Sequence, residues 1–356
     1  MKRITRDREK FGGIDILYEL GLAGAVAVRV PDDVDIVARR VADLLRRFAD
    51  NPALLHGRHV ESMFAYVASS LGQIAAIKQE DAGELHAVTD DVQPPDYRIM
   101  LKGGYEFLVE VKNFYKKNPM APLPIKEPYI QKPAKYAELF KRDLKLAVYW
   151  ARLGVWTLTS VDTMLFQNGK CSLSFREAAK ITEMHLLGDH MIGTTPPLTL
   201  RLSADPSKSR SDQAVGVVGF TIRSANLYCS ETVIDDPLER NLAWYFIRYS
   251  SWPVSKSQPV FENGQLVHLG FIARPSETVP DQGFELFGWM SEMISRHYLA
   301  LTMSDEGQEI ERLLPSTHLD PGSLGVLVPD DYRGKSLRLW RFFTDPKSNT
   351  SFAFFA

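Results

Sequence analysis

Hydrophobic and polar residues alternate along residues 97–112, which is the pattern of a β-hairpin. One set of alternating positions holds Tyr105, Phe107, Val109 and Val111, and the other holds Glu106, Leu108, Glu110 and Lys112. Because successive side chains of a strand point to opposite faces, we expect Glu110 and Lys112 on the same face. Gly103 and Gly104 supply the backbone freedom that a tight turn requires. The turn would bring Asp96, which opens the first strand, beside Glu110.

The segments around this hairpin carry both helical and strand patterns. Apolar residues recur at helical spacing in residues 34–48, 57–71, 136–150 and 174–187, whereas residues 74–79, 85–88 and 155–159 are typical of strands. Five prolines between residues 116 and 133 argue against a regular helix or a central strand, so we expect a loop there. The order of elements predicts an α/β fold in which the hairpin extends a sheet.

The chain of 356 residues is long enough for two domains, and residues 193–197 carry the best boundary signal. We predict a first domain of residues 1–192, with an N-terminal helical segment, and a second of residues 193–356. The second has strand patterns at 198–202 and 215–222, a hairpin turn at 262–265, and amphipathic stretches at 237–250 and 284–301. This is an α+β domain of unnamed fold with a role in recognition, sensing or oligomerisation. Its aromatic residues favour a packed core or an oligomer interface over a winged-helix DNA reader.

Charge is distributed unevenly along the chain. The net charge is −2, which argues against a protein that coats nucleic acid through overall basicity. Residues 98–152, however, contain twelve Lys or Arg against five acids, a local balance of +7. We predict nucleic-acid contacts, and therefore salt-dependent binding, by Lys116, Lys117, Lys141, Arg142 and Lys145. The alternative for Lys141, Arg142 and Lys145 is the solvated side of a helix.

Several classes of protein are disfavoured by the composition. Residues 1–10 are highly charged, and no apolar run is long enough to span a bilayer, so we expect a cytoplasmic protein without a membrane partner. Cys171 and Cys229 have no paired spacing, which argues against a disulfide framework or a structural zinc site. His185 and His190 are five positions apart and miss the spacing of four that places two imidazoles on one metal.

The hairpin carries groups suited to metal-assisted phosphodiester cleavage. Mg²⁺ is usually held by one or two carboxylates together with water and phosphate oxygens. Asp96, Glu110 and the carbonyl of Val111 could hold such an ion, which would activate a water molecule and offset charge on phosphorus. Lys112, on the same strand face, would orient the attacking water and stabilise the transition state.

Asp96, the hairpin and Glu110-Val111-Lys112 together resemble the PD-(D/E)xK nuclease superfamily, over about residues 55–160. The resemblance implies a restriction-endonuclease-like mixed sheet flanked by helices, and it adds Glu61 in the preceding helix as a further metal ligand. It also implies an endonuclease that uses Mg²⁺, or Mn²⁺ in its place, and acts on DNA in restriction, anti-phage defence or repair. Homodimers are expected because two sites are needed to cut two strands.

Other interpretations of these residues stay open at this stage. Glu-x-Lys is common on exposed strands, where it is part of a solvated face or forms a cross-strand ion pair. A catalytically inactive nuclease fold could also serve as a nucleic-acid-binding or regulatory scaffold. In a third interpretation, the second domain senses a small molecule or protein that activates the nuclease.

Overall fold

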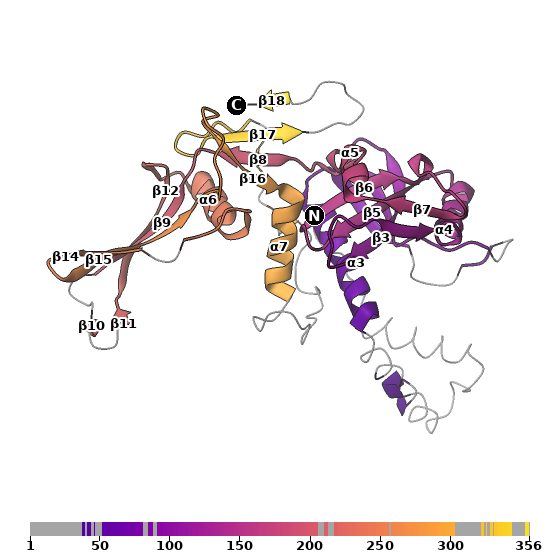
Figure 1. Ribbon diagram of the computed structural model, residues 1–356, viewed down its shortest axis with the longest axis horizontal. Helices are drawn as coiled ribbons and strands as arrows, with labels where there is room; N and C mark the ends of the chain where they lie inside the picture. Colours follow the sequence, from indigo (N-terminus) through magenta and orange to yellow (C-terminus); the bar gives the residue numbers. More distant parts are fainter. Residues whose placement is uncertain are drawn as a thin grey trace.

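A five-stranded mixed sheet forms the centre of the first half of the chain in this computed structural model (Figure 1). The structure describes residues 38, 39, 41–43, 46, 52–80, 85–87, 91–205, 210–212, 217–255, 258–302, 322, 323, 325, 328, 329, 331–343 and 353–355. The strand order is β1 (Ile74–Gln79), β2 (Tyr97–Leu101), β3 (Glu106–Phe114), β5 (Asp143–Trp150) and β6 (Val155–Ser160). Only β3 and β5 are parallel, and helix α4 (Glu127–Leu139) lies between them in the chain. The predicted N-terminal helix at 34–48 falls mostly outside the described residues.

The predicted hairpin is confirmed. Strands β2 and β3 are antiparallel, with Tyr97 opposite Val109 and Met100 opposite Glu106. Gly104 occupies the turn at φ +85°, a conformation that glycine adopts without strain. The odd-numbered positions of β3, such as Val109, join a core beneath helix α3 (Pro52–Ser70). The even-numbered positions, such as Leu108, face a second core that includes residues of α4.

The predicted helix at 136–150 is wrong beyond Leu139. Helix α4 ends at Leu139, and the strand β5 occupies Asp143–Trp150. Every residue of β5 after Asp143 is buried, because a central parallel strand is covered on both faces. Such a strand shows no alternation of polar and apolar positions, and a continuous apolar run does not distinguish a strand from a helix.

The prediction of a loop at 116–133 is also wrong in part. Strand β4 (Leu123–Lys126) pairs with β7 (Lys170–Leu173), and α4 begins at Glu127. Pro128 stands in the first turn of α4, where a backbone N–H is not needed. Pro133 lies within the helix and is buried, so packing tolerates the lost hydrogen bond.

Two further elements differ from their predictions. Residues 85–87 belong to no strand, contrary to the prediction of one at 85–88. The predicted helix at 174–187 is interrupted: α5 (Phe175–Lys180) is capped by Ser174 and Glu177, and a short 3-10 helix, η2, follows at Met184–Leu187.

The second half of the chain is built from antiparallel sheets. The larger has the order β13 (Thr232–Ile234), β12 (Ile222–Cys229), β9 (Leu198–Ala204), β15 (Gln265–Ala273) and β14 (Gln258–Glu262), and it packs against α6 (Pro237–Tyr249). A two-stranded ribbon pairs β10 (Arg210–Asp212) with β11 (Val217–Gly219). The other sheet contains β16 (Glu285–Trp289), β8 (Met191–Thr194), β17 (Leu339–Phe343) and β18 (Ala353–Phe355). The expected amphipathic stretch at 284–301 therefore divides into β16 and helix α7 (Met290–Thr302). In Figure 1 the larger sheet extends to the left, and α7 stands between it and the first sheet.

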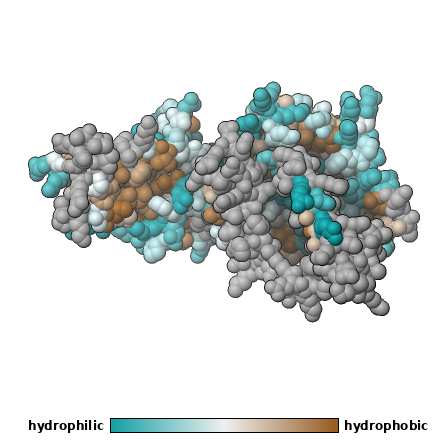
Figure 2. Space-filling view, turned by 90° about the horizontal axis from the view of Figure 1, so that it is seen from below, coloured by the Kyte–Doolittle hydropathy of each residue, from teal (hydrophilic) through white to brown (hydrophobic). Residues whose placement is uncertain are grey.

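Apolar side chains gather on the larger antiparallel sheet, where Figure 2 shows a brown patch. The half-buried or exposed hydrophobic residues of this sheet include Leu200, Leu202, Phe261, Leu269 and Phe271. Apolar surface of this kind is typical of interaction sites. The role of residues 193–356 in recognition, sensing or oligomerisation stays a prediction.

One hydrophobic core connects the two halves of the chain. It contains Phe64 and Trp156 from the first half together with Phe246, Phe287 and Tyr298 from the second. The indole Nε1 of Trp156 donates a hydrogen bond to the hydroxyl of Ser295 in α7, at 2.9 Å. Phe246, Phe287 and Tyr298 thus belong to a packed core, whereas Trp244 is exposed. The predicted boundary after residue 192 falls within β8, and the division into two domains stays a prediction.

No helix among the described residues is long and apolar enough to cross a membrane. Cys171 and Cys229 are both buried and free.

Asp189 holds the beginning of α7 in place. Its Oδ1 accepts a hydrogen bond from the backbone N–H of Ser291 at 2.9 Å, and its Oδ2 accepts one from the Ser291 hydroxyl at 2.6 Å. Burial raises the pKa of Asp189 from 3.8 to about 7, although both hydrogen bonds favour the ionised form. The folded state therefore binds a proton at pH values where the unfolded state has released it.

We expect this carboxyl to make the protein less stable as the pH rises from about 4 to about 7, by at most about 4 kcal/mol. Asp189→Asn, which carries no charge, should remove that part of the pH dependence. Thermal unfolding at pH 5 and at pH 8 measures this effect. The difference in thermal stability between the wild type and the variant should be smaller at pH 8 than at pH 5. The exposed Asp162→Asn serves as control, and a wild-type advantage independent of pH would contradict the assignment.

Candidate functional site

Asp96 is fixed against the backbone of β3. Its Oδ2 accepts a hydrogen bond from the N–H of Val111 at 2.7 Å. Strand β2 begins at Tyr97, opposite Val109, so Val111 lies just beyond the end of the β2–β3 ladder. The carboxylate takes the place of the missing strand partner. Since the N–H and C=O of one strand residue point to the same side, the Val111 carbonyl also points toward Asp96.

Glu110 and Lys112 lie on the same face of β3, as predicted. The Lys112 ammonium is 3.4 Å from Oε1 of Glu110, whose residue is only 4% exposed. Tyr129, in the first turn of α4, donates a hydrogen bond from its hydroxyl to the same oxygen of Glu110. The ammonium of Lys112 also lies 4.0 Å from the centre of the Tyr129 ring. Tyr129 thus orients both the Glu110 carboxylate and the Lys112 ammonium.

The two carboxyls have environments that disfavour their charge. Burial, followed by the charge of Glu110, raises the pKa of Asp96 to about 8, against the opposing effect of the Val111 hydrogen bond. Burial also raises the pKa of Glu110, whereas Lys112 and Tyr129 act in the opposite direction. Burial and the nearby charge of Glu110 raise the pKa of Tyr129, so its hydroxyl keeps its proton. Acids arranged in this way are common at functional sites.

Glu61 lies close enough to affect these acids, but it has a partner of its own. Its charge contributes to the raised pKa of Asp96. Its carboxylate forms an ion pair with Arg58 at 2.7 Å, one turn earlier in α3. Its backbone carbonyl accepts a hydrogen bond from the hydroxyl of Tyr97 at 3.1 Å, which ties α3 to the strand that follows Asp96.

The oxygen atoms at this site are of the kind that Mg²⁺ prefers. One oxygen of each carboxylate is engaged, and within the described part of the chain Oδ1 of Asp96 and Oε2 of Glu110 accept no hydrogen bond. Asp96, Glu110 and the Val111 carbonyl therefore fit a divalent cation. The described residues contain no group of three or more His, Cys, Asp or Glu side chains that could hold a metal ion, so Glu61 does not complete such a group.

The exposed basic residues are divided between two ends of the sheet. Lys116 and Lys117 follow the end of β3, whereas Lys141 and Arg142 immediately precede β5. Phe107, near the start of β3, lies opposite Asp143, so Lys141 and Arg142 stand at the other end of β3 from Lys116 and Lys117. Arg142 is also engaged in an ion pair with Glu106 at 2.7 Å.

The prediction that Lys145 contacts nucleic acid is corrected by the structure. Its side chain is 2% exposed, and its ammonium lies 2.6 Å from Oε2 of Glu183. It also donates a hydrogen bond to the hydroxyl of Ser160 at 3.0 Å. Lys145 lies in the buried part of strand β5, so its charge is paired inside the protein instead of facing a phosphate.

Tyr129 contacts both Glu110 and Lys112, and this role is not predicted from the sequence. The prolines of residues 116–133 predict a loop, which gives no reason to expect a contact with Glu110. The available signal was Glu127-Pro128, an acid and a proline typical of the first turn of a helix. The contact with Glu110 depends on how α4 packs on β3, which the local sequence does not encode.

Part of the chain is similar to solved structures. The solved structure of Hjc, a Holliday junction resolvase from the archaeal hyperthermophile Archaeoglobus fulgidus, matches 37% of this chain and 100% of its own, with 16% identity and a TM-score of 0.30. Hjc has the PD-(D/E)xK nuclease fold. No protein-family model matches the chain. No curated protein matches it either.

Proposed function

We propose that this chain is a metal-dependent endonuclease that hydrolyses phosphodiester bonds, with Asp96, Glu110 and Lys112 as its site. One observation carries the proposal. The carboxylate of Asp96 is held on the N–H of Val111, between the two residues of β3 that supply a second carboxylate and an ammonium. An ion pair on an exposed strand would leave Glu110 accessible to water, whereas Glu110 is only 4% exposed. Such an ion pair would also not require a second carboxylate, that of Asp96, beside it.

Each residue then has a chemical role. Asp96, Glu110 and the Val111 carbonyl would hold Mg²⁺ or Mn²⁺, which when bound supplies a Lewis acid and a more acidic water molecule. Tyr129 holds Glu110 in place through its hydroxyl. Lys112 donates to phosphate oxygens as negative charge develops in the transition state, where such a donor has its largest effect.

We propose DNA as the polymer, in restriction, anti-phage defence or repair, and a homodimer as the acting form. The motif resemblance supports these choices. Lys116 and Lys117, exposed just after the strand that carries Lys112, are the basic residues best placed to contact the phosphates beside the scissile bond. Binding that depends on them should weaken as the salt concentration rises.

The test is cleavage of plasmid, linear and single-stranded DNA by the purified chain. We expect cleavage with Mg²⁺ or Mn²⁺ and none after EDTA is added. Asp96→Asn should remove both the cleavage and the heat of metal binding in isothermal titration, because it takes away one of two carboxylates. Asp91→Asn is the matched control, since Asp91 pairs with Lys135 and takes no part in the site.

The titration also distinguishes the alternative function. An inactive scaffold that binds nucleic acid or regulates another protein would bind DNA without cleaving it, and its metal binding would not depend on Asp96. That result would end the nuclease proposal.

A further inference from the structure

A pocket of about 270 Å³ opens beside Lys112. Lys112 forms part of its wall, and the rest of the wall comes from β5, from all four residues of β4 and from the start of α4. Tyr129, which contacts both Glu110 and Lys112, also lines it. The pocket therefore adjoins the candidate site, although neither Asp96 nor Glu110 belongs to its wall.

The charged side chains of this wall are all basic. Lys112 and Lys126 line the pocket, and its described lining residues include no aspartate or glutamate. The ammonium of Lys112 has a partner in Glu110, at 3.4 Å. Lys126 is exposed, and within the described part of the chain its side chain forms no ion pair or hydrogen bond. The positive charge of Lys126 is therefore available to an anionic group at the pocket.

The acid that follows Lys126 in the chain is engaged elsewhere. Oε1 of Glu127 accepts a hydrogen bond from the side-chain amide of Gln131, one turn later in α4, at 3.0 Å. Glu127 does not line the pocket. The charge next to Lys126 in the sequence is thus directed along the helix, and it leaves the pocket basic.

Rigid elements hold the main chain of Lys126 near Lys112. Lys126 is the last residue of β4, which pairs with β7, and it is also the N-cap of α4. Tyr129 follows three residues later, about 4.5 Å along the helix axis. The centre of the Tyr129 ring lies 4.0 Å from the Lys112 ammonium. The two lysines are therefore held at one pocket by the packing of β4 and α4 on β3.

The other side chains of the wall, apart from Tyr129, are apolar. They are Leu123, Pro124, Ile125, Ile130 and Leu146. Ile125, Ile130 and Leu146 are buried in the core that α4 shares with the sheet, so they form the inner surface of the pocket. An apolar surface cannot replace the water around a phosphate, but it can cover the carbon atoms of a sugar. The wall thus fits a group that is apolar in the middle and carries anions at its ends.

We propose that one step of a DNA strand lies across this pocket, with the scissile phosphate at Lys112, the next phosphate on Lys126, and the deoxyribose that joins them against the apolar wall. The inference rests on the proposed function, and it adds Lys126 to the lysines that contact the DNA backbone. A phosphate contact carries no sequence information, so Lys126 should strengthen binding to all sequences alike.

The salt dependence of DNA binding by the full chain tests the proposal. Fluorescence anisotropy with two labelled duplexes of unrelated sequence, in EDTA so that no cleavage occurs, gives the affinity at several salt concentrations. Lys126→Gln should reduce the slope of log affinity against log salt concentration by about 1, and to the same extent for both duplexes. Lys126→Arg keeps the charge and should retain the wild-type slope. In cleavage assays with Mg²⁺, Lys126→Gln should affect KM more than kcat, because the phosphate contact exists before the transition state.

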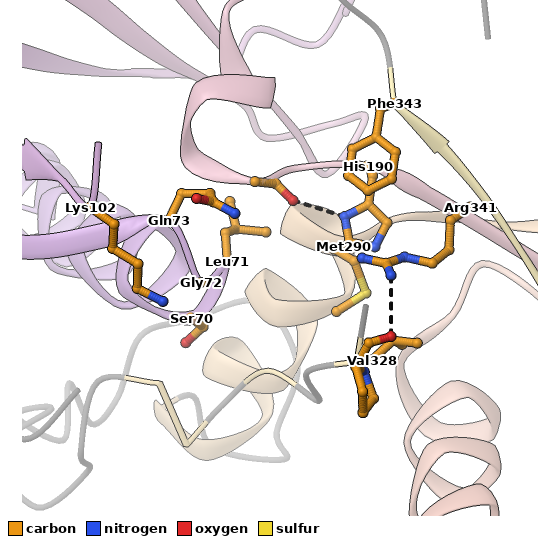
Figure 3. A pocket seen from close by; sticks show the side chains of 12 residues that line it. Ser70, Leu71, Gly72, Gln73, Lys102, His190, Met290, Val328, Arg341 and Phe343 are labelled. Atoms are coloured by element: carbon orange, nitrogen blue, oxygen red, sulfur yellow. Dashed lines mark hydrogen bonds between the residues drawn. The ribbon is translucent and has the colours of Figure 1, made fainter. Parts of the chain in front are cut away.

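Lys102→Gln is the matched control. Lys102 is an exposed lysine in the turn between β2 and β3, at the end of the hairpin away from Lys112, and it lines a different pocket (Figure 3). Its substitution changes the net charge by the same amount as Lys126→Gln, and the salt slope should stay that of the wild type. Thermal unfolding of each variant checks that it is folded.

An unchanged salt slope in Lys126→Gln would overturn the proposal, because no phosphate would then contact this lysine. An equal reduction in Lys102→Gln would also overturn it, since the effect would be a general loss of electrostatic attraction. A loss confined to one of the two duplexes would make Lys126 a base contact instead. An inactive wild type, in contrast, would contradict the proposed function and would not affect the binding measurement, which needs no cleavage.

Discussion

Lys112→Ala should slow DNA cleavage by a factor of about 10² to 10³, which corresponds to about 3 to 4 kcal/mol of barrier. Its ammonium lies 3.4 Å from Glu110 and over the Tyr129 ring, so it is already oriented before a substrate arrives. The variant keeps Asp96 and Glu110, and it should therefore fold and bind DNA much as the wild type does. Initial cleavage rates at saturating Mg²⁺, with DNA binding measured separately, give the effect.

Lys170→Ala supplies the control for this experiment. Lys170 is an exposed lysine in β7, on a different sheet, and its removal changes the net charge by the same amount. A general loss of electrostatic attraction would affect both variants equally. Full activity of Lys112→Ala would remove Lys112 from the mechanism and with it the assignment of the site.

Lys145→Ala should lower the free energy of unfolding by about 3 to 5 kcal/mol. The substitution removes the ammonium that pairs with Glu183 at 2.6 Å and leaves that carboxylate buried without its cation. The hydroxyl of Ser160, which also contacts Glu183 at 2.9 Å, cannot replace the lost charge. Urea unfolding followed by circular dichroism measures the change.

Two comparisons separate this stability effect from a role in binding. Lys141→Ala, at an exposed position shortly before β5, should change stability by less than about 0.5 kcal/mol. The double variant Lys145→Met with Glu183→Leu should recover much of the loss, because an apolar pair can replace a buried ion pair. If Lys145→Ala weakened DNA binding and left stability unchanged, Lys145 would be a nucleic-acid contact after all.

Elements defined by local chemistry were predictable from the sequence. The hairpin of β2 and β3 follows from alternation and two glycines, and it correctly places Glu110 and Lys112 on one face. Helix α6 was expected at 237–250 and occupies Pro237–Tyr249, where Asp236 accepts hydrogen bonds from two backbone N–H groups of the first turn. The hairpin turn at 262–265 likewise joins β14 to β15.

Features that depend on packing were not predictable. Strand β5 is buried on both faces, so apolar residues fill every position from 146 to 150 and no period of two is visible there, and Lys145 could not be recognised as a core residue. The contact between Tyr129 and Glu110 joins residues 19 positions apart through the seating of α4 on β3. The spacing of apolar and polar residues predicts whether a segment forms a helix or a strand. Which polar side chains come into contact depends on the elements that pack against that segment.

The hydrogen bond between Trp156 and Ser295 joins residues 139 positions apart in the chain, inside a core that both halves share. A fragment ending at residue 192 would lose α7 and expose Phe64 and Trp156 to water. Such a fragment should aggregate instead of serving as a minimal catalytic unit. For the same reason, denaturation of the full chain should proceed as a single cooperative transition, and insertions that separate the halves would disturb the sheet on which Asp96 and Glu110 depend.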